Sequence, residues 1–280
     1  FRRVLFRSGG KPVEAELRFT RHGPVIHSEP GKNRAFAVRS AWFEPGMAPY
    51  FGSIHYMYAS NFQEFQTAMA NWGAPSENQV YADTKGNIGW VVGGRAPIRP
   101  NWDGLMPVPG DGRHEWAGFL AGSQLPSRYN PPQGWFASAN EMNLPPNYPY
   151  RERKLGFEWA SADRYQRLSD VLARPGKVSI EDSLRLQNDV LSTPARRLLP
   201  LLAKLQSNDA RAQAALNLLR AWDGTVTTGS GAAALFEVWW SRYLGHVFKE
   251  LLLSKAGAAI IVSPDTTLLL NALEKPETVF

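Results

Sequence analysis

Cysteine is absent from the sequence. Its absence excludes disulfide bonds, thiolate nucleophiles and cysteine-ligated zinc sites together, and it is compatible with any redox compartment. Long apolar runs are absent as well, because the best candidate, near the end of the chain, is interrupted by His246, Lys249, Glu250 and Lys255. A helix needs about 20 apolar residues to cross a bilayer, so we expect no membrane span.

Most short motifs of catalysis and cofactor binding are also missing. The sequence has no GxSxG elbow, no phosphate-binding loop and no GxGxxG fingerprint, and His114-Glu115 lacks the second histidine of an HExxH pair. The five histidines show no metal-ligand spacing and are interpreted as surface or hydrogen-bonded structural residues. We predict no organic cofactor. The sequence shows no repeat at periods of about 20 to 50 residues, so a solenoid or propeller is not supported.

The net charge of +6 is a weak guide, because the opening FRRVLFRS contributes three arginines to it. We interpret residues 1–8 as the translation of a sequencing adapter (TTC AGA CGT GTG CTC TTC CGA TCT) and exclude them from fold reasoning. The remaining balance is 28 basic to 25 acidic residues, or +3, with no basic run longer than Arg196-Arg197. We therefore predict no nucleic-acid partner. The same interpretation predicts that the chain is a fragment that lacks its natural start.

The composition is that of a globular protein: 44% of residues are hydrophobic, and 24 Gly and 21 Pro imply short elements joined by many turns. Residues 9–160 carry the short alternating runs that are typical of strands. Glu14–Thr20 alternates, and Arg34–Ser40 alternates as its expected partner strand. Gln79–Gly93 predicts a hairpin whose turn needs a positive φ at Gly86.

We expect one helix within residues 9–160 and mainly helices in residues 161–280. Asn61 and Glu64 form a capping box at the start of a helix over Ser60–Asn71. Residues 95–147 are rich in proline, and they predict an extended ordered loop. Loops of this kind usually carry function or pack around it. The later helices are expected to begin after caps at Ser161 and at Ser179 with its partner Asp182, and to cover Ala210–Trp222 and Ala232–Leu253.

Aromatic residues suggest one functional class. Ten Trp and nine Tyr could line a sugar platform, and Ala82–Trp90 is similar to a single blade motif of a carbohydrate-binding propeller. Large aromatic side chains more often fill cores. A noncatalytic, Trp-rich carbohydrate-binding module of a secreted protein is therefore kept as the alternative function.

A set of short segments, each weak alone, occurs in a recognisable order. The segments are Thr20–Val25, Ser40–Trp42, Asn61–Phe65, Asn78–Asp83, Gly86–Gly89, Pro107–Gly110, Glu115–Gly118, Asn130-Pro131, Ala139-Asn140 and Ala162–Arg164. Their order resembles the β chain of the penicillin acylase family of N-terminal nucleophile hydrolases. The similarity runs colinearly from about Lys11 to the helices near Leu244.

The resemblance implies an α+β fold, part of the layered αββα sandwich of these hydrolases, with a helical extension after residue 160. It implies a hydrolase that acts on linear amides, of the β-lactam or acyl-homoserine lactone class. In the family, the first residue of the β chain, usually Ser, attacks the amide and its own α-amine acts as the general base. The matching positions begin well after that residue, so we expect the nucleophile to be missing and this chain alone to be inactive.

Asn140 matches the oxyanion-hole asparagine of the family, whose side-chain nitrogen donates to the tetrahedral intermediate. Fixed donors of this kind contribute roughly 3 to 4 kcal/mol each to transition-state stabilisation. Its position after Gly134-Trp135-Phe136, in a Pro-flanked loop, suits a rigid donor. The alternative is an asparagine that bonds its own loop backbone.

Arg164 matches the arginine near the active site, which is thought to hold the nucleophile's amine and the asparagine in place. A guanidinium, with its planar fork of donors, suits that orienting role. The alternative is an ordinary ion pair with Asp163 or Glu158. Asn140 and Arg164 are separated by two more residues than in the best-known members. This insertion puts the match of the intervening loop in doubt, but not the pairing of the two residues.

Two carboxylates have weaker matches. Glu152 lies close to where some members supply a ligand to a structural calcium ion, and the other carboxylates of such a site would lie outside this chain. The alternative is a solvated charge beside Arg151 and Arg153. Glu77 falls near a position that shapes the acyl pocket of relatives, so a substrate-binding role is predicted for it.

The resemblance also implies partners and a location. We expect a small acyl amide as substrate and an α chain from the same precursor, which is a zymogen, and a periplasmic or secreted location. Cut at both ends, such a chain would leave strand edges and apolar helix faces uncovered, so we expect poor stability when it is expressed alone.

Overall fold

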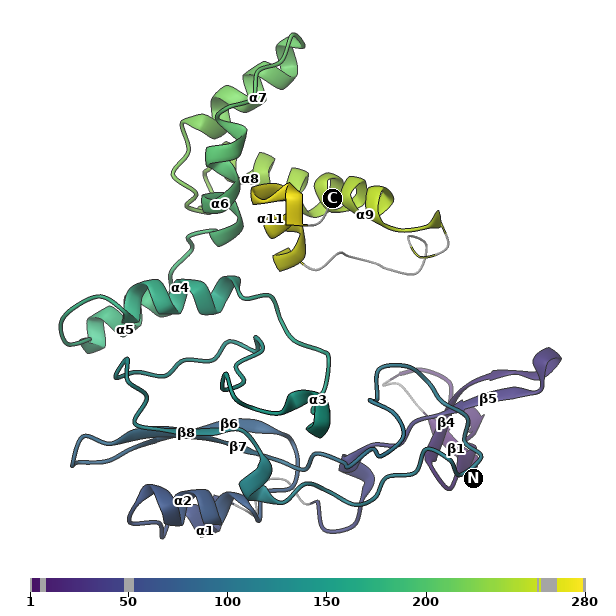
Figure 1. Ribbon diagram of the computed structural model, residues 1–280. Coiled ribbons are helices and arrows are strands. Elements are labelled where there is room, and N and C mark those ends of the chain that lie inside the picture. The colour runs from purple at the N-terminus through teal and green to yellow at the C-terminus, as the bar shows by residue number, and fades with distance from the viewer. Residues whose placement is uncertain (1, 6–8, 48–52, 256, 258–265, 279–280) are drawn as a thin grey trace. The chain divides into compact units, whose positions relative to one another are not determined.

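A computed structural model of the chain describes residues 2–5, 9–47, 53–255, 257 and 266–278. These residues fall into two compact units, Phe1–Phe136 with Asn143–Glu158, and Ala137–Met142 with Trp159–Phe280. The first unit holds the strands and the second is mainly helical (Figure 1). None of the helices in the described residues is both long enough and apolar enough to cross a bilayer.

The described residues of the first unit form three antiparallel sheets. Their strands are β1 (Arg2–Leu5) with β2 (Val13–Glu16), then β3 (Phe19–Thr20), β4 (Gly23–Glu29) and β5 (Arg34–Ala37), and then β6 (Glu77–Ala82), β7 (Ile88–Gly93) and β8 (Ser127–Tyr129). The short helices of this unit are α1 (Ser53–Tyr56), α2 (Phe62–Met69) and α3 (Tyr150–Arg153), with single 3-10 turns at Pro30–Lys32, Ala41–Phe43 and Gly122–Gln124.

The predicted pairing of Glu14–Thr20 with Arg34–Ser40 is wrong. β5 pairs with β4, a strand that we did not predict, and β4 pairs in turn with β3. The two residues between Thr20 and Gly23 close a tight hairpin, with Gly23 at a φ of 125°. Segments joined by a short loop lose less chain entropy on pairing than segments far apart in the sequence. Two local hairpins therefore form in place of the predicted direct pairing of the first segment with the third.

The core of the first unit lies where α2 packs against the sheet of β6 and β7 (Figure 1). The predicted helix cap is confirmed, because the Asn61 side chain accepts a hydrogen bond of 2.9 Å from the amide of Glu64. Gly89 lets the helix come close, since a Cβ there would lie 2.5 Å from the Phe62 ring. The buried residues of this core are Phe65, Ala68, Met69, Trp72 and Val91.

The predicted hairpin over residues 79–93 is confirmed by β6 and β7. Asp83 organises its turn by accepting hydrogen bonds of 2.9 Å from the amides of Lys85 and Asn87. The side chain and the backbone amide of Asn87 together hold the pKa of Asp83 down at about 2. Gly86 has a φ of 86°, as the turn chemistry predicts.

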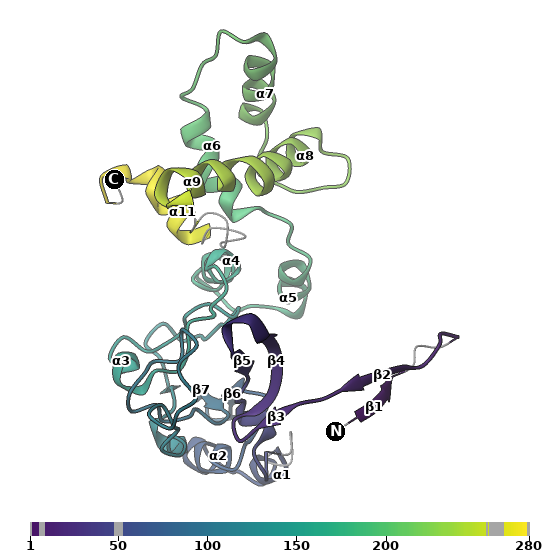
Figure 2. The same cartoon turned by 90° about the vertical axis from the view of Figure 1, so that its right-hand side faces the viewer.

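The second unit is built from helices. They are α4 (Asp163–Leu172), α5 (Ile180–Gln187), α6 (Thr193–Leu202), α7 (Ala210–Arg220), α8 (Gly231–Val238), α9 (Gly245–Leu252) and α11 (Thr266–Glu274), with a short 3-10 turn at Pro276–Thr278. A π-helical segment, Trp239–Leu244, joins α8 to α9 so that they run as one continuous rod (Figure 2). Ala195, Leu198, Leu219, Phe236 and Leu270 form the buried core between these helices.

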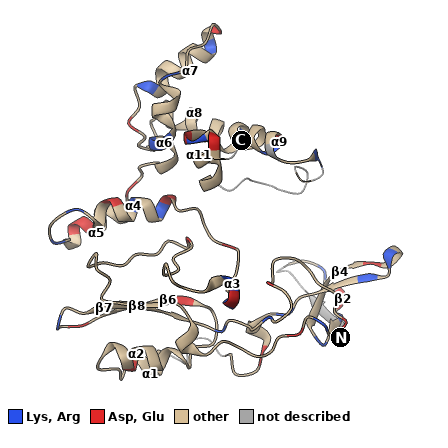
Figure 3. Ribbon diagram, in the orientation of Figure 1, with Lys and Arg blue, Asp and Glu red and all other residues tan. Residues whose placement is uncertain are grey.

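Local signals in this unit are mostly confirmed. Ser179 and Asp182 form the predicted capping box of α5. The predicted cap at Ser161 is wrong by one residue, because α4 begins at Asp163 after Ala162, which makes no side-chain cap. Acidic and basic residues are interspersed along the described helices and strands (Figure 3), which is the pattern of a solvated surface.

Candidate active site

The loop of residues 137–142 holds Asn140 in an uncommon backbone conformation. Its φ is 66°, in the left-handed region, which asparagine adopts more readily than most residues. The carbonyl oxygen of Asn140 accepts a hydrogen bond of 2.8 Å from the backbone amide of Ala160. This bond fixes the loop to the segment that leads into α4, within the same compact unit.

Arg164, in the first turn of α4, holds this loop by two hydrogen bonds. Its Nη2 donates to the carbonyl oxygen of Ala139 at 2.6 Å and to Oδ1 of Asn140 at 2.9 Å. The sequence pairs these two residues by resemblance, and the structure places their side chains in contact. Among the described residues we find no ion pair of Arg164, neither with Asp163 nor with Glu158.

The hydrogen bond from Arg164 sets the direction of the Asn140 side-chain amide. A guanidinium has only donors, so the amide oxygen must face it and the amide nitrogen must face away. No hydrogen bond of Nδ2 of Asn140 is found within the part of the chain that the structure describes. The side chain is exposed, so its N–H groups are free to donate to a carbonyl oxygen that approaches from solvent. A donor fixed in this way can stabilise the negative charge of a tetrahedral intermediate.

Glu141, next to this donor, was missed by the sequence analysis. Its side chain is only 6% exposed, and its Oε2 accepts a hydrogen bond of 2.6 Å from the amide of Ala139. A single glutamate in a polar, Pro-rich loop gives no periodic signal of burial, so nothing in the sequence pattern could have singled it out.

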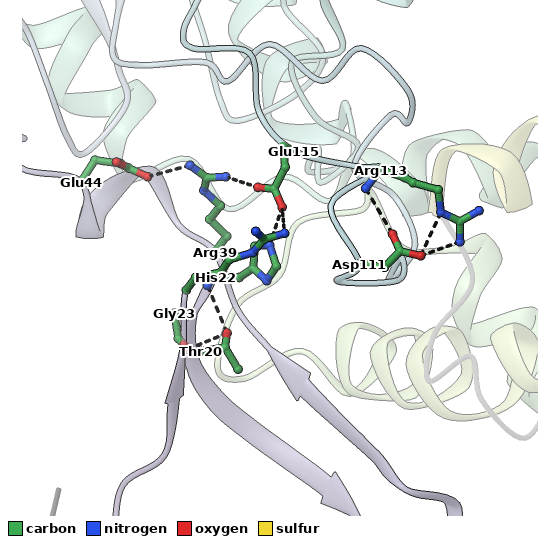
Figure 4. A network of polar contacts seen from close by, with 9 residues as sticks. Thr20, His22, Gly23, Arg39, Glu44, Asp111, Arg113 and Glu115 are labelled. Carbon is green, nitrogen blue, oxygen red and sulfur yellow. Dashed lines mark hydrogen bonds and ion pairs between the residues drawn. The ribbon is translucent and has the colours of Figure 1, made fainter.

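A second polar cluster surrounds Glu115 in the first unit (Figure 4). Its carboxylate accepts hydrogen bonds from His22 at 2.7 Å, Arg21 at 2.8 Å and Arg39 at 3.0 Å. The hydrogen bond from His22 is the main cause that lowers the pKa of Glu115. Arg39 also lies over the Trp116 ring, 4.4 Å from its centroid. The cluster thus joins the β3–β4 hairpin to the loop that carries Glu115.

The cavity beside this cluster measures about 810 Å³. Three of the guanidinium groups that line it are already paired, Arg21 and Arg39 with Glu115 and Arg34 with Glu29. Charges satisfied in this way are typical of a scaffold. We therefore assign the cluster a structural role and place the candidate site at Asn140.

Glu77 is the first residue of β6, and its Oε2 accepts a hydrogen bond of 2.9 Å from Gln79. Side chains alternate along a strand, so Glu77 shares a face with Tyr81, whose ring packs against Phe62 and Phe65 near α2. The opposite face carries Trp90, which stacks on Phe136. The substrate-binding role of Glu77 stays a prediction.

Glu152 lies exposed on the single turn of α3, between Arg151 and Arg153. Calcium takes about 6 to 8 oxygen ligands, and one carboxylate supplies at most two of them. Among the described residues, no group of three or more His, Asp or Glu side chains could hold a metal ion. These residues do not by themselves make a calcium site, so the role of Glu152 stays a prediction that depends on ligands from elsewhere.

Comparison with known proteins decides the family. The family model described as penicillin amidase matches residues 2–279. The chain belongs to this family. The resemblance drawn from the ordered short segments is thereby confirmed.

The curated relatives of this chain carry acylase names. It is 31% identical to the acyl-homoserine lactone acylase QuiP of Pseudomonas fluorescens, over 91% of this chain and 32% of that protein. It is 30% identical to the penicillin acylase 2 proenzyme of a Pseudomonas species, over 81% of this chain and 29% of the relative. It is 33% identical to penicillin G acylase of Escherichia coli, over 73% of this chain and 25% of the relative. The chain thus spans about a third or less of these relatives.

The fold of the chain matches a solved structure. The thermostable penicillin G acylase from Alcaligenes faecalis aligns with a TM-score of 0.72 at 24% identity, over 93% of this chain and 48% of that one. The predicted N-terminal nucleophile hydrolase fold, with mixed helices and sheets, is confirmed. The alternative of a carbohydrate-binding module is not supported, and Trp72 and Trp90 are core residues, each 1% exposed.

Proposed function

We propose that the protein to which this chain belongs hydrolyses acyl amides, of the β-lactam or acyl-homoserine lactone class. The curated relatives carry acylase names of both kinds. The observation that carries the proposal is the contact of Arg164 with Asn140, which turns the amide nitrogen of Asn140 outward as a fixed donor.

In the proposed reaction, the hydroxyl oxygen of an N-terminal nucleophile outside this chain attacks the amide carbon, and the α-amine of the same residue takes the hydroxyl proton. The carbonyl oxygen gains the negative charge, and Nδ2 of Asn140 donates to it. The carbon–nitrogen bond then breaks, the amine leaves with the proton, and water hydrolyses the acyl ester. Arg164 would act on this sequence through Asn140, since its Nη2 donates to both Asn140 and Ala139.

This proposal includes the fragment status of the chain. The nucleophile would lie upstream, and an α chain would come from the same precursor in a periplasmic or secreted protein. The word proenzyme in the name of one relative supports the precursor. Glu152 would contribute to a calcium site together with carboxylates outside this chain, and Glu77 would help to shape the acyl pocket.

Extension of the gene upstream tests the proposal first. We expect a different sequence in place of residues 1–8 and, well upstream of it, a Ser, Thr or Cys at a cleavage junction. The full-length protein should then release the amine from an acyl-homoserine lactone or a penicillin. An upstream sequence without such a residue, or a full-length protein that hydrolyses neither class, would rule the proposal out.

A further inference from the structure

Glu141 is the only charged side chain buried among the residues that the structure describes, with 6% of its surface exposed. Removing a carboxylate from water is costly unless hydrogen bonds or an opposite charge replace the lost hydration. No ion pair of Glu141 is found in the described part of the chain. A buried charge in a surface loop therefore calls for a specific reason.

The hydrogen bonds of Glu141 offset little of the cost of removing its carboxylate from water. Its Oε2 accepts one short hydrogen bond, 2.6 Å, from the amide of Ala139. Its Oε1 is buried without a hydrogen-bond partner among the described residues. An ionised carboxylate can accept about four hydrogen bonds, so a residue retained only for stability would be better satisfied.

The hydrogen bond that Glu141 makes among the described residues spans the candidate donor. Ala139 precedes Asn140 and Glu141 follows it, so the side chain reaches back across Asn140 to the amide on its far side. The carbonyl oxygen of the same Ala139 accepts the second bond of Arg164. Both polar groups of Ala139 are thus held, one by the guanidinium and one by the carboxylate.

We propose that Glu141 is a positioning residue for the oxyanion donor, which holds the Ala139–Asn140 backbone so that Nδ2 of Asn140 keeps one direction. This inference rests on the proposed function of Asn140. The left-handed φ of 66° at Asn140 costs energy for a residue other than glycine. The bond from Ala139 to Glu141 offsets that cost on one side, as the bond from Ala160 does on the other.

The test compares substitutions in the full-length protein that contains this chain. Glu141→Gln keeps an oxygen of the same reach, which can accept from the Ala139 amide without the charge. Glu141→Ala removes the bond, and Glu141→Asp keeps the charge but shortens the side chain. Glu181→Ala is the matched control, because Glu181 is an exposed glutamate on α5 in the same unit.

We expect Glu141→Ala and Glu141→Asp to lower kcat about 10- to 100-fold with KM nearly unchanged, because a small misplacement of a catalytic group costs this much. Glu141→Gln should stay within a few-fold of the parent, and Glu181→Ala should equal it. Unchanged kcat in Glu141→Asp, or an equal loss in Glu141→Gln and Glu141→Ala, would overturn the proposal.

Hydrogen exchange separates this inference from the proposed function. A peptide that covers residues 137–142 should exchange faster in Glu141→Asp than in the parent or in Glu141→Gln, whether or not the protein hydrolyses an amide. Equal exchange in all three would overturn the role of Glu141 even in an active acylase. Absence of hydrolysis in the parent protein would instead contradict the function proposed for Asn140.

Discussion

Nη2 of Arg164 lies 2.9 Å from Oδ1 of Asn140 and 2.6 Å from the carbonyl oxygen of Ala139. One nitrogen atom thus fixes both the side chain and the preceding peptide of the candidate oxyanion donor. The guanidinium presents its donors in a rigid, planar arrangement, which suits it to hold two acceptors at once.

Replacement of Asn140 by Ala removes the donor. In the full-length protein we expect kcat to fall about 100- to 1000-fold, because each oxyanion-hole donor contributes on that scale to the transition state. KM should change little, since the ground-state carbonyl carries less charge. Steady-state kinetics with an acyl-homoserine lactone or a penicillin check this. Full activity in Asn140→Ala would remove Asn140 from the mechanism.

Replacement of Arg164 by Lys keeps the positive charge and removes the planar fork. A flexible ammonium group would hold Ala139 and Asn140 less rigidly, so we expect about a 10- to 100-fold loss of kcat. Arg185→Lys, at an exposed arginine of α5, serves as the control. The prediction fails if Arg164→Lys matches this control.

Arg167 and Asp189 make the best-shielded of the ion pairs found among the described residues, at 2.5 Å with side chains 20% and 18% exposed. Arg167→Met leaves the carboxylate without its donor and should lower the free energy of unfolding by about 1.5 to 3 kcal/mol. The exposed pair of Arg18 with Glu16 provides the comparison, because Arg18→Met should cost at most about 1 kcal/mol. Urea unfolding measures both, and equal losses would contradict the prediction.

Gly89→Ala should destabilise the first unit. The added Cβ would lie 2.5 Å from the Phe62 ring and 2.9 Å from the carbonyl oxygen of Arg128, so α2 or β8 must shift. Overpacking of this kind costs typically about 1 to 3 kcal/mol. Gly31→Ala meets nothing within 4 Å and should leave the melting temperature nearly unchanged. A melting temperature that both variants share with the parent would argue against this close packing.

The turn at Asp83 should show a pH dependence. The hydrogen bonds from Asn87 lower the pKa of Asp83 from 3.8 to about 2 in the folded state. A group with a lowered pKa stabilises the fold above its unfolded pKa, and that contribution is lost as the pH falls toward the folded pKa. The stability difference between the parent and Asp83→Ala should therefore shrink as the pH falls from about 4 to about 2. A difference that is constant over this window would contradict the prediction.

Local sequence signals predicted local structure well. The Asn61 and Ser179 caps, the Asp83 turn and the helical spacing after residue 161 each depend on residues a few positions apart. Strand pairing in the β3–β5 sheet was predicted wrongly, because alternation identifies a strand but not its partner. The placement of Asn140 beside Arg164 came from resemblance alone, since the two residues are 24 positions apart and no repeat in the sequence would bring them together.

Among the described residues, Asn140 accepts hydrogen bonds from Ala160 and Arg164, and both of these residues belong to the helical unit. The excursion of residues 143–158, which packs with the other compact unit, takes no part in that anchorage. Insertions and deletions there would leave the contact of Asn140 with Arg164 in place. The length and sequence of residues 143–158 can therefore change without moving the side-chain amide of Asn140.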